Sequence, residues 1–342
     1  MKIGIMTGGG DAPGLNGIIE ASCRVLLSRG VEVVGIEDGF EGIFGGSVKP
    51  ISFAAIDNLH STAGTFLGTS NKSGTEGREA EFLAGWKKLG LRGLLVAGGD
   101  GTFAGLKAFA NEIPIIGVPK TIDNDLSGTE VTFGYDTACS VVADAVDSLR
   151  ATADAHRRVI VVETMGRTAG WIALGGGMAS FADVVLLPER PYSLSRLKEF
   201  VLARKAAGRR GLMVVVAEGA HAAGEDASVA FKVEGAPQAE RYGGIAWQLS
   251  RWIEKECGWE SRNVVLGHLQ RARPPTPTDR FLTLAMGVEA ARMALEGAWG
   301  QCTVYRAGRV QRAPLADVMG PARLVTHDHR WVKLFEAMGS FI

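Results

Sequence analysis

Short, continuously apolar segments recur along this chain and alternate with longer stretches of helical periodicity. Strands that are apolar along their whole length are typical of parallel sheets whose two faces are covered by helices. The pattern therefore predicts an α/β fold. The predicted strands are KIGIMT, VEVVGI, GLLVAGG, IPIIGV, RVIVVET, DVVLLPE and GLMVVVAEG.

Three stretches between or after these strands are predicted to be helices. Residues 15–30 place apolar side chains on one helical face and end at Gly30, a typical helix stop. Residues 136–155 and 278–297 have a similar pattern. The 46 glycines cluster where strands end and helices begin. Open α/β sheets bind their ligands at that edge, so we expect the functional site there.

Composition excludes several classes of function. The 342 residues suggest two domains or one large domain, and 37 basic residues balance 37 acidic ones. We therefore expect no nucleic-acid partner and no membrane partner. Four isolated cysteines predict neither a disulfide framework nor a metal–thiolate site. The chain opens on a predicted strand, and no apolar run approaches the roughly 20 residues of a membrane span. A cytoplasmic location is expected.

The first glycine-rich turn, residues 4–17, joins the first predicted strand to the first predicted helix. Residues without side chains let backbone N–H groups approach phosphate oxygens, and a helix N-terminus adds partial positive charge. The turn GIMTGGGDAPGLNG matches neither the dinucleotide fingerprint nor the Walker loop. A phosphate-binding loop and a purely structural turn are both compatible with it.

The second such turn, residues 94–106, contains a carboxylate. Asp100 stands among Gly98, Gly99 and Gly101, with Thr102 beside it. A phosphate would be repelled by this carboxylate unless a divalent cation lay between them, so the turn favours a magnesium–nucleotide site. The alternative is that Asp100 only caps the helix that follows.

The segment VPKTIDNDLSGT places two more carboxylates on one short loop. Asp123 and Asp125 flank Asn124, so both can face one side while Asn124 faces the other. A phosphoryl acceptor needs a carboxylate to take its proton, and Lys120 and Thr121 are suited to contact the transferred phosphate. Taken alone, the same residues would also suit an ordinary Asx-turn.

Six motifs together resemble the phosphofructokinase family, which includes ATP-dependent 6-phosphofructokinases and pyrophosphate-dependent fructose 6-phosphate phosphotransferases. They are TGGGDAPGLN, GGDGT, PKTIDND, VVETMGRTAGW, AEG and LGHLQR, in family order over nearly the whole chain. The resemblance implies two Rossmann-like, three-layer domains with largely parallel sheets and an active site in the cleft between them. Residues 1–134 plus 270–312 would bind the phosphoryl donor, and residues 135–269 plus 313–342 the sugar phosphate.

The resemblance also implies roles for individual residues. Asp123 would deprotonate the sugar 1-hydroxyl, Asp125 would support it and the metal, and Arg167 would stabilise charge in the transition state. Lys120 and Thr121, which would contact the transferred phosphate, complete the predicted catalytic set. Asp100 would serve Mg²⁺. The implied donor-site residues are Gly9, Gly10, Asn71, Lys72, Gly99, Asp100, Gly101 and Thr102. The implied substrate-binding residues are Thr121, Asp123, Asp125, Arg158, Met165, Gly166, Arg167, Glu218, Arg262, His268 and Arg271.

In the family, Arg158 and Arg262 reach the sugar 6-phosphate from a neighbouring subunit, so the resemblance implies a homodimer or homotetramer. The implied reaction moves a phosphoryl group from ATP–Mg²⁺ to the 1-hydroxyl of fructose 6-phosphate in glycolysis. Glu20 stands where regulated bacterial relatives use an arginine for an effector phosphate, so we expect weak regulation by that route.

Several alternatives stay open. Gly101 resembles ATP users and Lys120 resembles pyrophosphate users, so a reversible pyrophosphate-dependent enzyme is the second hypothesis. Asn71 replaces an arginine that many relatives have. The segment ARPP, residues 272–275, replaces the usual glycine pair. This replacement reduces the freedom of the backbone and adds Arg273 near the predicted sugar site, so another acceptor such as sedoheptulose 7-phosphate is a further hypothesis. A non-catalytic, sugar-phosphate-sensing member is the third hypothesis. A lipid or NAD kinase also carries GGDGT, but TIDND argues against it.

Overall fold

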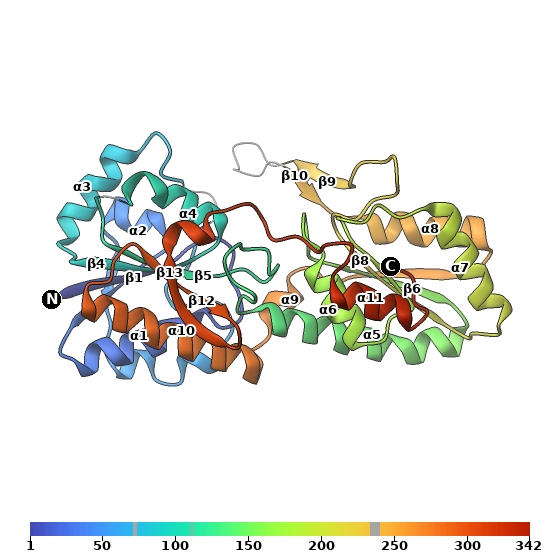
Figure 1. The fold of residues 1–342 in the computed structure, drawn as a ribbon, viewed down its shortest axis with the longest axis horizontal. Coiled ribbons are helices and arrows are strands. Elements are labelled where there is room, and N and C mark those ends of the chain that lie inside the picture. The colour runs from blue at the N-terminus through green and yellow to red at the C-terminus, as the bar shows by residue number, and fades with distance from the viewer. Residues whose placement is uncertain (71–73, 111, 233–239) are drawn as a thin grey trace. The chain divides into compact units, whose positions relative to one another are not determined.

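The computed structural model describes residues 1–70, 74–110, 112–232 and 240–342, and these fall into two units (Figure 1). Unit 1 comprises Met1–Thr137 and Arg271–Ala322, and unit 2 comprises Ala138–Gln270 and Arg323–Ile342. The resemblance predicted that residues 313–322 belong to the sugar-phosphate domain, with residues 135–269. They belong to unit 1 because Leu315 and Val318 are buried in its core.

Unit 1 is built on a seven-stranded sheet with the order β13-β12-β5-β4-β1-β2-β3. The five inner strands are parallel, and the edge strands β3 and β13 are antiparallel to their neighbours. Its strands are β1 (Lys2–Thr7), β2 (Glu32–Ile36), β3 (Val48–Pro50), β4 (Gly93–Gly98), β5 (Ile115–Pro119), β12 (Gln301–Arg306) and β13 (Arg309–Pro314).

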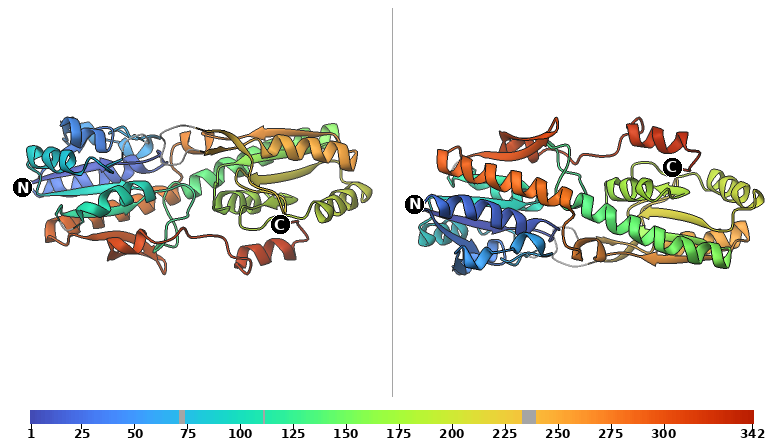
Figure 2. Two further views of the ribbon diagram at one scale, coloured as in Figure 1. Left: turned by 90° about the horizontal axis from the view of Figure 1, so that it is seen from above. Right: turned by 90° about the horizontal axis from the view of Figure 1, so that it is seen from below.

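Helices cover both faces of this sheet. Two long helices run side by side on one face, and three shorter ones lie on the other (Figures 1 and 2). The first group is α1 (Leu15–Ser28) and α10 (Pro277–Glu296), and the second is α2 (Phe40–Gly45), α3 (Glu79–Leu89) and α4 (Asp100–Leu106). Short 3₁₀ turns η1 (Ala54–Ile56), η2 (Leu59–Ser61), η3 (Lys107–Phe109) and η4 (Leu315–Val318) complete the unit.

Unit 2 has a parallel, four-stranded sheet with the order β11-β6-β8-β7. Helices α7 and α8 lie on one face, and α5 and α6 lie on the other, with α11 beside α6 (Figure 1). The strands are β6 (Val159–Thr164), β7 (Val184–Leu186), β8 (Leu212–Ala217) and β11 (Ser261–Val265), and a separate hairpin pairs β9 (Val229–Lys232) with β10 (Glu240–Tyr242). The helices are α5 (Tyr135–His156), α6 (Trp171–Ala179), α7 (Leu194–Ala206), α8 (Ile245–Cys257), α9 (Leu269–Ala272) and α11 (Arg330–Ala337).

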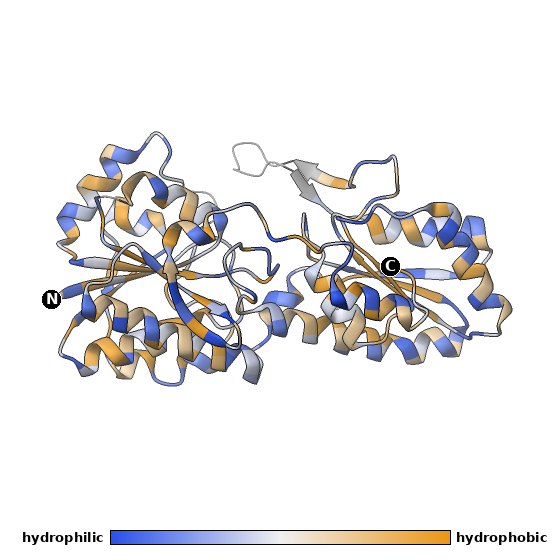
Figure 3. Cartoon of the chain, in the orientation of Figure 1, coloured by the Kyte–Doolittle hydropathy of each residue, from blue (hydrophilic) through white to orange (hydrophobic). Residues whose placement is uncertain are grey.

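The prediction of an α/β fold with largely parallel sheets is confirmed. Each of the seven predicted strands is present, as β1, β2, β4, β5, β6, β7 and β8, and the three predicted helices are α1, α5 and α10. Figure 3 shows why these were easy to find: the central strands of both sheets are hydrophobic along their length. Strands β11 and β12 were missed because polar residues interrupt them.

Within the described part of the chain, no helix is both long enough and apolar enough to cross a membrane.

Candidate active site

The residues predicted to bind the phosphoryl donor lie at one edge of the unit 1 sheet. Strands β1, β4 and β5 are neighbours, so their carboxyl ends lie together. Gly9 and Gly10 follow β1, and Asp100 begins α4 directly after β4. The loop from Lys120 to Asp125 follows β5. Three motifs that are far apart in sequence therefore meet at this edge, as expected for a parallel sheet.

The glycines of this edge permit close packing around Thr102. A β-carbon at Gly8 would lie 2.7 Å from the Thr102 Oγ1 atom, and one at Gly98 would lie 2.6 Å from its Cβ atom. Thr102 is buried, with 4% of its surface exposed. Gly9 has a φ of +77°, which favours glycine. Gly101 differs, because a β-carbon there would meet no atom within 4 Å.

Two cations hold the loop after β1. The buried Lys120 ammonium donates a hydrogen bond to the Gly10 carbonyl oxygen. Arg271 Nη1 lies 3.4 Å from the Asp11 carbonyl oxygen, to which it donates, and 3.9 Å from the Asp11 carboxylate. A β-carbon at Gly10 would clash with the Arg271 guanidinium. Arg271, predicted to bind the sugar phosphate, is thus packed against the loop after β1, which is predicted to bind the phosphoryl donor.

In the loop after β5, the asparagine is buried and the two aspartates beside it are not. Asn124 has a φ of +55°, a left-handed conformation that asparagine tolerates. Its buried Oδ1 atom accepts a 2.9 Å hydrogen bond from the Thr132 backbone N–H. Asp123 and Asp125 on either side remain partly exposed. The Asp123 backbone N–H donates to the Thr121 Oγ1 atom at 3.1 Å, which tightens the turn.

The Asp123 carboxylate has an unusual environment. Its Oδ1 atom is buried and accepts no hydrogen bond from the described residues. Burial, followed by the charge of Asp125, raises the pKa of Asp123 to about 6, although Arg271 and Lys120 oppose the shift. The same burial, followed by the charge of Arg271, lowers the pKa of Lys120 to about 8. A buried oxygen without a partner is costly, so it marks a place where a donor group from a ligand would be stabilised.

Asp100 is the residue predicted to serve a metal. It keeps solvent contact, but partial loss of hydration and then the charge of Asp125 raise its pKa to about 6. A divalent cation between these carboxylates would relieve that repulsion, and oxygen ligands suit Mg²⁺. No cluster of three or more metal-ligating side chains occurs among the residues that the structure describes. Asp100 and Asp125 would supply one or two oxygen ligands to Mg²⁺, and the phosphates of a bound donor would supply others, which is a usual ligand set for this ion.

Five of the residues predicted to bind the sugar lie at the carboxyl ends of neighbouring strands in unit 2. Met165, Gly166 and Arg167 follow β6, Glu218 follows β8, and the exposed His268 follows β11. The sheet order β11-β6-β8 brings these three loops to one edge.

Backbone contacts fix the loop that carries Arg167. The Gly219 N–H donates to the Gly166 carbonyl oxygen at 3.2 Å, and a β-carbon at Gly219 would clash with the Arg167 carbonyl group. The Met165 N–H donates to the Gln270 Oε1 atom at 3.3 Å. The Arg167 guanidinium lies over the Tyr242 ring, 4.9 Å from its centroid.

Two predicted phosphate ligands lie at the opposite edge of the same sheet. Arg158 directly precedes β6, and Arg262 is the second residue of β11. Glu260 Oε1 lies 3.7 Å from Arg158 Nη1 and 2.8 Å from Arg262 Nη2. Strand β6 is six residues long, so its two ends lie roughly 20 Å apart at about 3.3 Å per residue. Within one copy of unit 2, these arginines therefore do not meet Arg167.

Sequence reasoning missed several residues that support the site. Gln270 stands inside the motif LGHLQR, but nothing in the sequence links it to Met165, 105 positions away. Gly219 belongs to the motif AEG and was not singled out. Asp11 and Tyr242 were also missed. Asn71 and Lys72, predicted to bind the donor, lie outside the described residues.

Comparison with known proteins gives consistent matches. A family profile described as "Phosphofructokinase" matches residues 2–294. A protein named ATP-dependent 6-phosphofructokinase from Chloroflexus aggregans is 43% identical over 331 residues, which cover 93% of this chain and 91% of the relative. ATP-dependent 6-phosphofructokinase 2 from Streptomyces coelicolor is 40% identical over 332 residues, with 96% and 97% covered.

Solved structures agree. Pichia pastoris phosphofructokinase in the T-state matches with a TM-score of 0.81 and 31% identity over 93% of this chain. The match spans 35% of that longer chain. A pyrophosphate-dependent phosphofructokinase from Marinobacter aquaeolei matches with a TM-score of 0.82 over 98% of this chain and 91% of its own. At 21% identity, the second match shows the fold alone.

The geometry around Lys120 predicts how two pKa values respond to a substitution. Arg271→Ala removes a positive charge that lowers the pKa of both Asp123 and Lys120. Both pKa values should therefore rise in the variant. Titration of carbon-13-labelled aspartate and lysine side chains by NMR measures them. A fall in either value would show that Arg271 does not lie beside these groups in solution.

Proposed function

This chain belongs to the phosphofructokinase family, and from that premise we propose that it transfers the γ-phosphoryl group of ATP to the 1-hydroxyl of fructose 6-phosphate. The products are fructose 1,6-bisphosphate and ADP, a step of glycolysis. Relatives named ATP-dependent 6-phosphofructokinase, matched over nearly their full length, support the reaction. We place the protein in the cytoplasm, in keeping with its free cysteines. The observation that carries the proposal is the buried Asp123 Oδ1 atom, which has no hydrogen-bond partner among the residues that the structure describes.

Asp123 is assigned as the general base. Its Oδ1 atom accepts the proton of the sugar 1-hydroxyl while the hydroxyl oxygen attacks the γ-phosphorus and the bond to the β,γ-bridging oxygen breaks. A base works best when its pKa approaches the working pH, and burial moves the pKa of Asp123 in that direction. Asp125 helps to keep that pKa high, so it tunes the base.

We assign positive groups to balance the charge of the transferring phosphoryl group. Lys120 and Arg271 support the loop of Gly9 and Gly10, whose backbone N–H groups we assign to donor phosphates. Arg167 is assigned to the developing charge in the transition state. Mg²⁺, held by Asp100 with Asp125 nearby, would neutralise the donor phosphates when bound.

The space at Gly101 supports ATP rather than pyrophosphate as the donor. A side chain at this position would occupy room that the α-phosphate of a nucleotide needs, and the structure is open there. Lys120, the residue that resembles pyrophosphate users, is engaged with the Gly10 carbonyl oxygen of its own chain. Its presence is therefore compatible with an ATP user. Pyrophosphate remains the second candidate donor.

The position of Arg158 and Arg262 supports a homo-oligomer. A sugar 6-phosphate is a dianion that needs converging cations, and arginine provides them best. These two arginines lie at the amino edge of the unit 2 sheet, away from Arg167. We propose that they complete the sugar-phosphate site of a neighbouring copy, in a homodimer or homotetramer.

The first prediction concerns turnover and its base. The purified protein should phosphorylate fructose 6-phosphate with ATP–Mg²⁺ and not with pyrophosphate. Asp123→Asn should lower kcat by about a hundredfold to ten-thousandfold because the base is lost, with KM for fructose 6-phosphate little changed. A coupled assay for each donor, with sedoheptulose 7-phosphate as a second acceptor, measures this. Pyrophosphate-only turnover would reverse the donor assignment, and an unchanged kcat in Asp123→Asn would refute the role of Asp123.

The second prediction is an acid limb in the pH profile. The base must be ionised to accept a proton, and its pKa is raised to about 6. The value of kcat/KM should therefore fall as the pH drops through about 6, and it should be steady above that range until another group titrates. Rates measured from pH 4.5 to 8 test this. A limb near pH 4, the range of an ordinary aspartate, would contradict the environment described for Asp123.

The third prediction tests sharing of sites between copies. Arg262→Ala and Asp123→Asn should each be nearly inactive alone. If Arg262 serves the neighbour, co-expression of the two variants should restore roughly a quarter of the wild-type activity, because about half of randomly paired dimers contain one intact site of two. No restored activity in a verified mixed oligomer would place Arg262 in its own subunit's site.

A further inference from the structure

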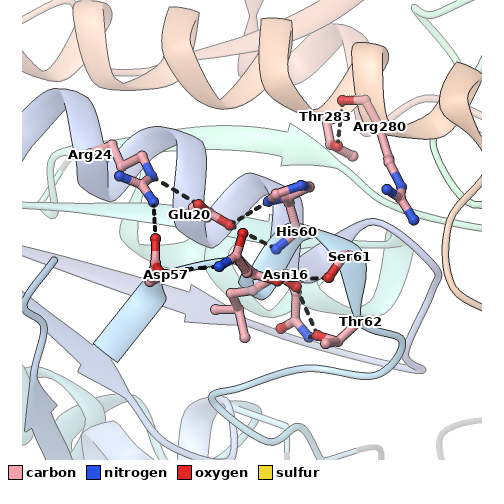
Figure 4. Close-up of polar contacts among 11 residues, drawn as sticks. Asn16, Glu20, Arg24, Asp57, His60, Ser61, Thr62, Arg280 and Thr283 are labelled. Carbon is pink, nitrogen blue, oxygen red and sulfur yellow. Dashed lines mark hydrogen bonds and ion pairs between the residues drawn. The ribbon is translucent and has the colours of Figure 1, made fainter. Parts of the chain in front are cut away.

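Helix α1 carries a row of polar side chains on a face that is largely buried. Asn16, Glu20 and Arg24 are spaced four residues apart, so they lie one above another along the helix (Figure 4). Asn16 is 3% exposed and Glu20 is 6% exposed. Buried polar groups of this kind destabilise a fold unless they are paired, so their partners show what the row holds in place.

The partners of Glu20 come from its own chain. Its Oε2 atom accepts 2.8 Å hydrogen bonds from the backbone N–H and the Nδ1 atom of His60. Its Oε1 atom accepts from Arg24 Nε at 2.8 Å, and Arg24 Nη2 also donates to Asp57 at 2.8 Å. Burial alone would raise the pKa of Glu20, but these hydrogen bonds outweigh it and lower that pKa. An ionised carboxylate only accepts, so His60 Nδ1 carries a proton.

Asn16 lies one turn before Glu20, near the N-terminus of α1. Its Nδ2 atom donates to the Thr62 Oγ1 atom at 2.8 Å and to the Ala63 carbonyl oxygen at 3.3 Å. Its Oδ1 atom accepts a 2.7 Å hydrogen bond from the Phe66 backbone N–H. The row on α1 therefore binds consecutive parts of one segment, residues 57–70, which we call the strap.

The other end of the strap contacts the loop assigned to donor phosphates. Thr65 Oγ1 lies 2.9 Å from Thr7 Oγ1, and Thr7 Oγ1 donates to the Gly68 carbonyl oxygen at 2.8 Å. Thr69 Oγ1 donates to the Gly9 carbonyl oxygen at 2.5 Å. Thr7 ends β1, immediately before the glycines. Hydrogen bonds to successive residues of the strap, joined by the strap's own backbone, thus link Glu20 to Gly9.

We propose that Glu20, together with Asn16, is a positioning residue of the phosphoryl-donor site: through the strap it fixes the backbone of Gly9 and Gly10 for the donor phosphates. The proposal rests on the proposed function, because it needs a phosphoryl donor at that loop. It also explains the acid at position 20. The carboxylate that disfavours an anionic effector on α1 is used to hold the donor site.

Substitutions at Glu20 and His60 test the proposal. Glu20→Gln keeps the side-chain size but places an N–H₂ group against donors, so it should loosen the strap and raise KM for ATP roughly fivefold. The value of kcat and KM for fructose 6-phosphate should change less than twofold. His60→Asn keeps a donor at the place of Nδ1 and should behave like the wild type, whereas His60→Ala should raise KM for ATP.

Asp183→Asn provides a matched control in unit 2. Asp183 is 6% exposed and, like Glu20, accepts from an arginine and a backbone N–H, namely Arg209 at 2.8 Å and Met213 at 2.9 Å. The variant Asp183→Asn should lower Tm about as much as Glu20→Gln does, and it should leave KM for ATP unchanged. Calorimetric titration with a non-hydrolysable ATP analogue provides a second readout, in which Glu20→Gln weakens binding and His60→Asn does not.

The outcomes separate the two proposals. Suppose that the wild type is active. If Glu20→Gln then keeps its KM for ATP, as Asp183→Asn is expected to, or changes both KM values together, Glu20 is only a structural residue. If Glu20→Gln does not fold, the half-exposed His60 decides the question, and equal KM values for His60→Ala and His60→Asn overturn the proposal. A wild type without ATP turnover would overturn the proposed function and, with it, the need for a donor site.

Discussion

The charge balance around the loop after β5 is the constraint on which the rest of the site depends. Burial and then the charge of Asp125 raise the pKa of Asp123, and Lys120 and Arg271 lie close enough to oppose this rise. Neither cation is free to neutralise it directly, because Lys120 binds the Gly10 carbonyl oxygen and Arg271 packs against Asp11. The carboxylate therefore stays basic, and the cations stay at the donor loop. One arrangement thus suits both the base and the anion-binding loop that we propose.

The architecture of the sheets decides where each function is located. In unit 1, three neighbouring parallel strands deliver the glycines, Asp100 and the aspartate loop to one edge. In unit 2, the loops proposed to bind the sugar also gather at carboxyl ends, but Arg158 and Arg262 are fixed at the amino ends by their places at the start of β6 and β11. A rigid strand cannot move a side chain from one edge of the sheet to the other. The proposed homo-oligomer follows from this separation.

Much of the fold could be predicted because the inner strands are buried on both faces and are apolar throughout, as in β4 and β8. Strand β12 could not, because it has polar residues at its ends and lies next to the edge of the sheet. The aspartate loop was found because its residues are adjacent in sequence. The contacts of Met165 with Gln270 and of Asn16 with Phe66 join residues 105 and 50 positions apart, and a single sequence contains no local signal for either.

The central claim is that Asp123 Oδ1 takes the proton of the acceptor hydroxyl. A crystal structure of the protein with fructose 6-phosphate and a non-hydrolysable ATP analogue measures this directly. We predict that Asp123 Oδ1 lies at about 2.6–3.2 Å from the sugar 1-hydroxyl oxygen, with that oxygen facing the γ-phosphorus. A 1-hydroxyl that hydrogen-bonds to another group, with Asp123 turned away from both ligands, would contradict the account.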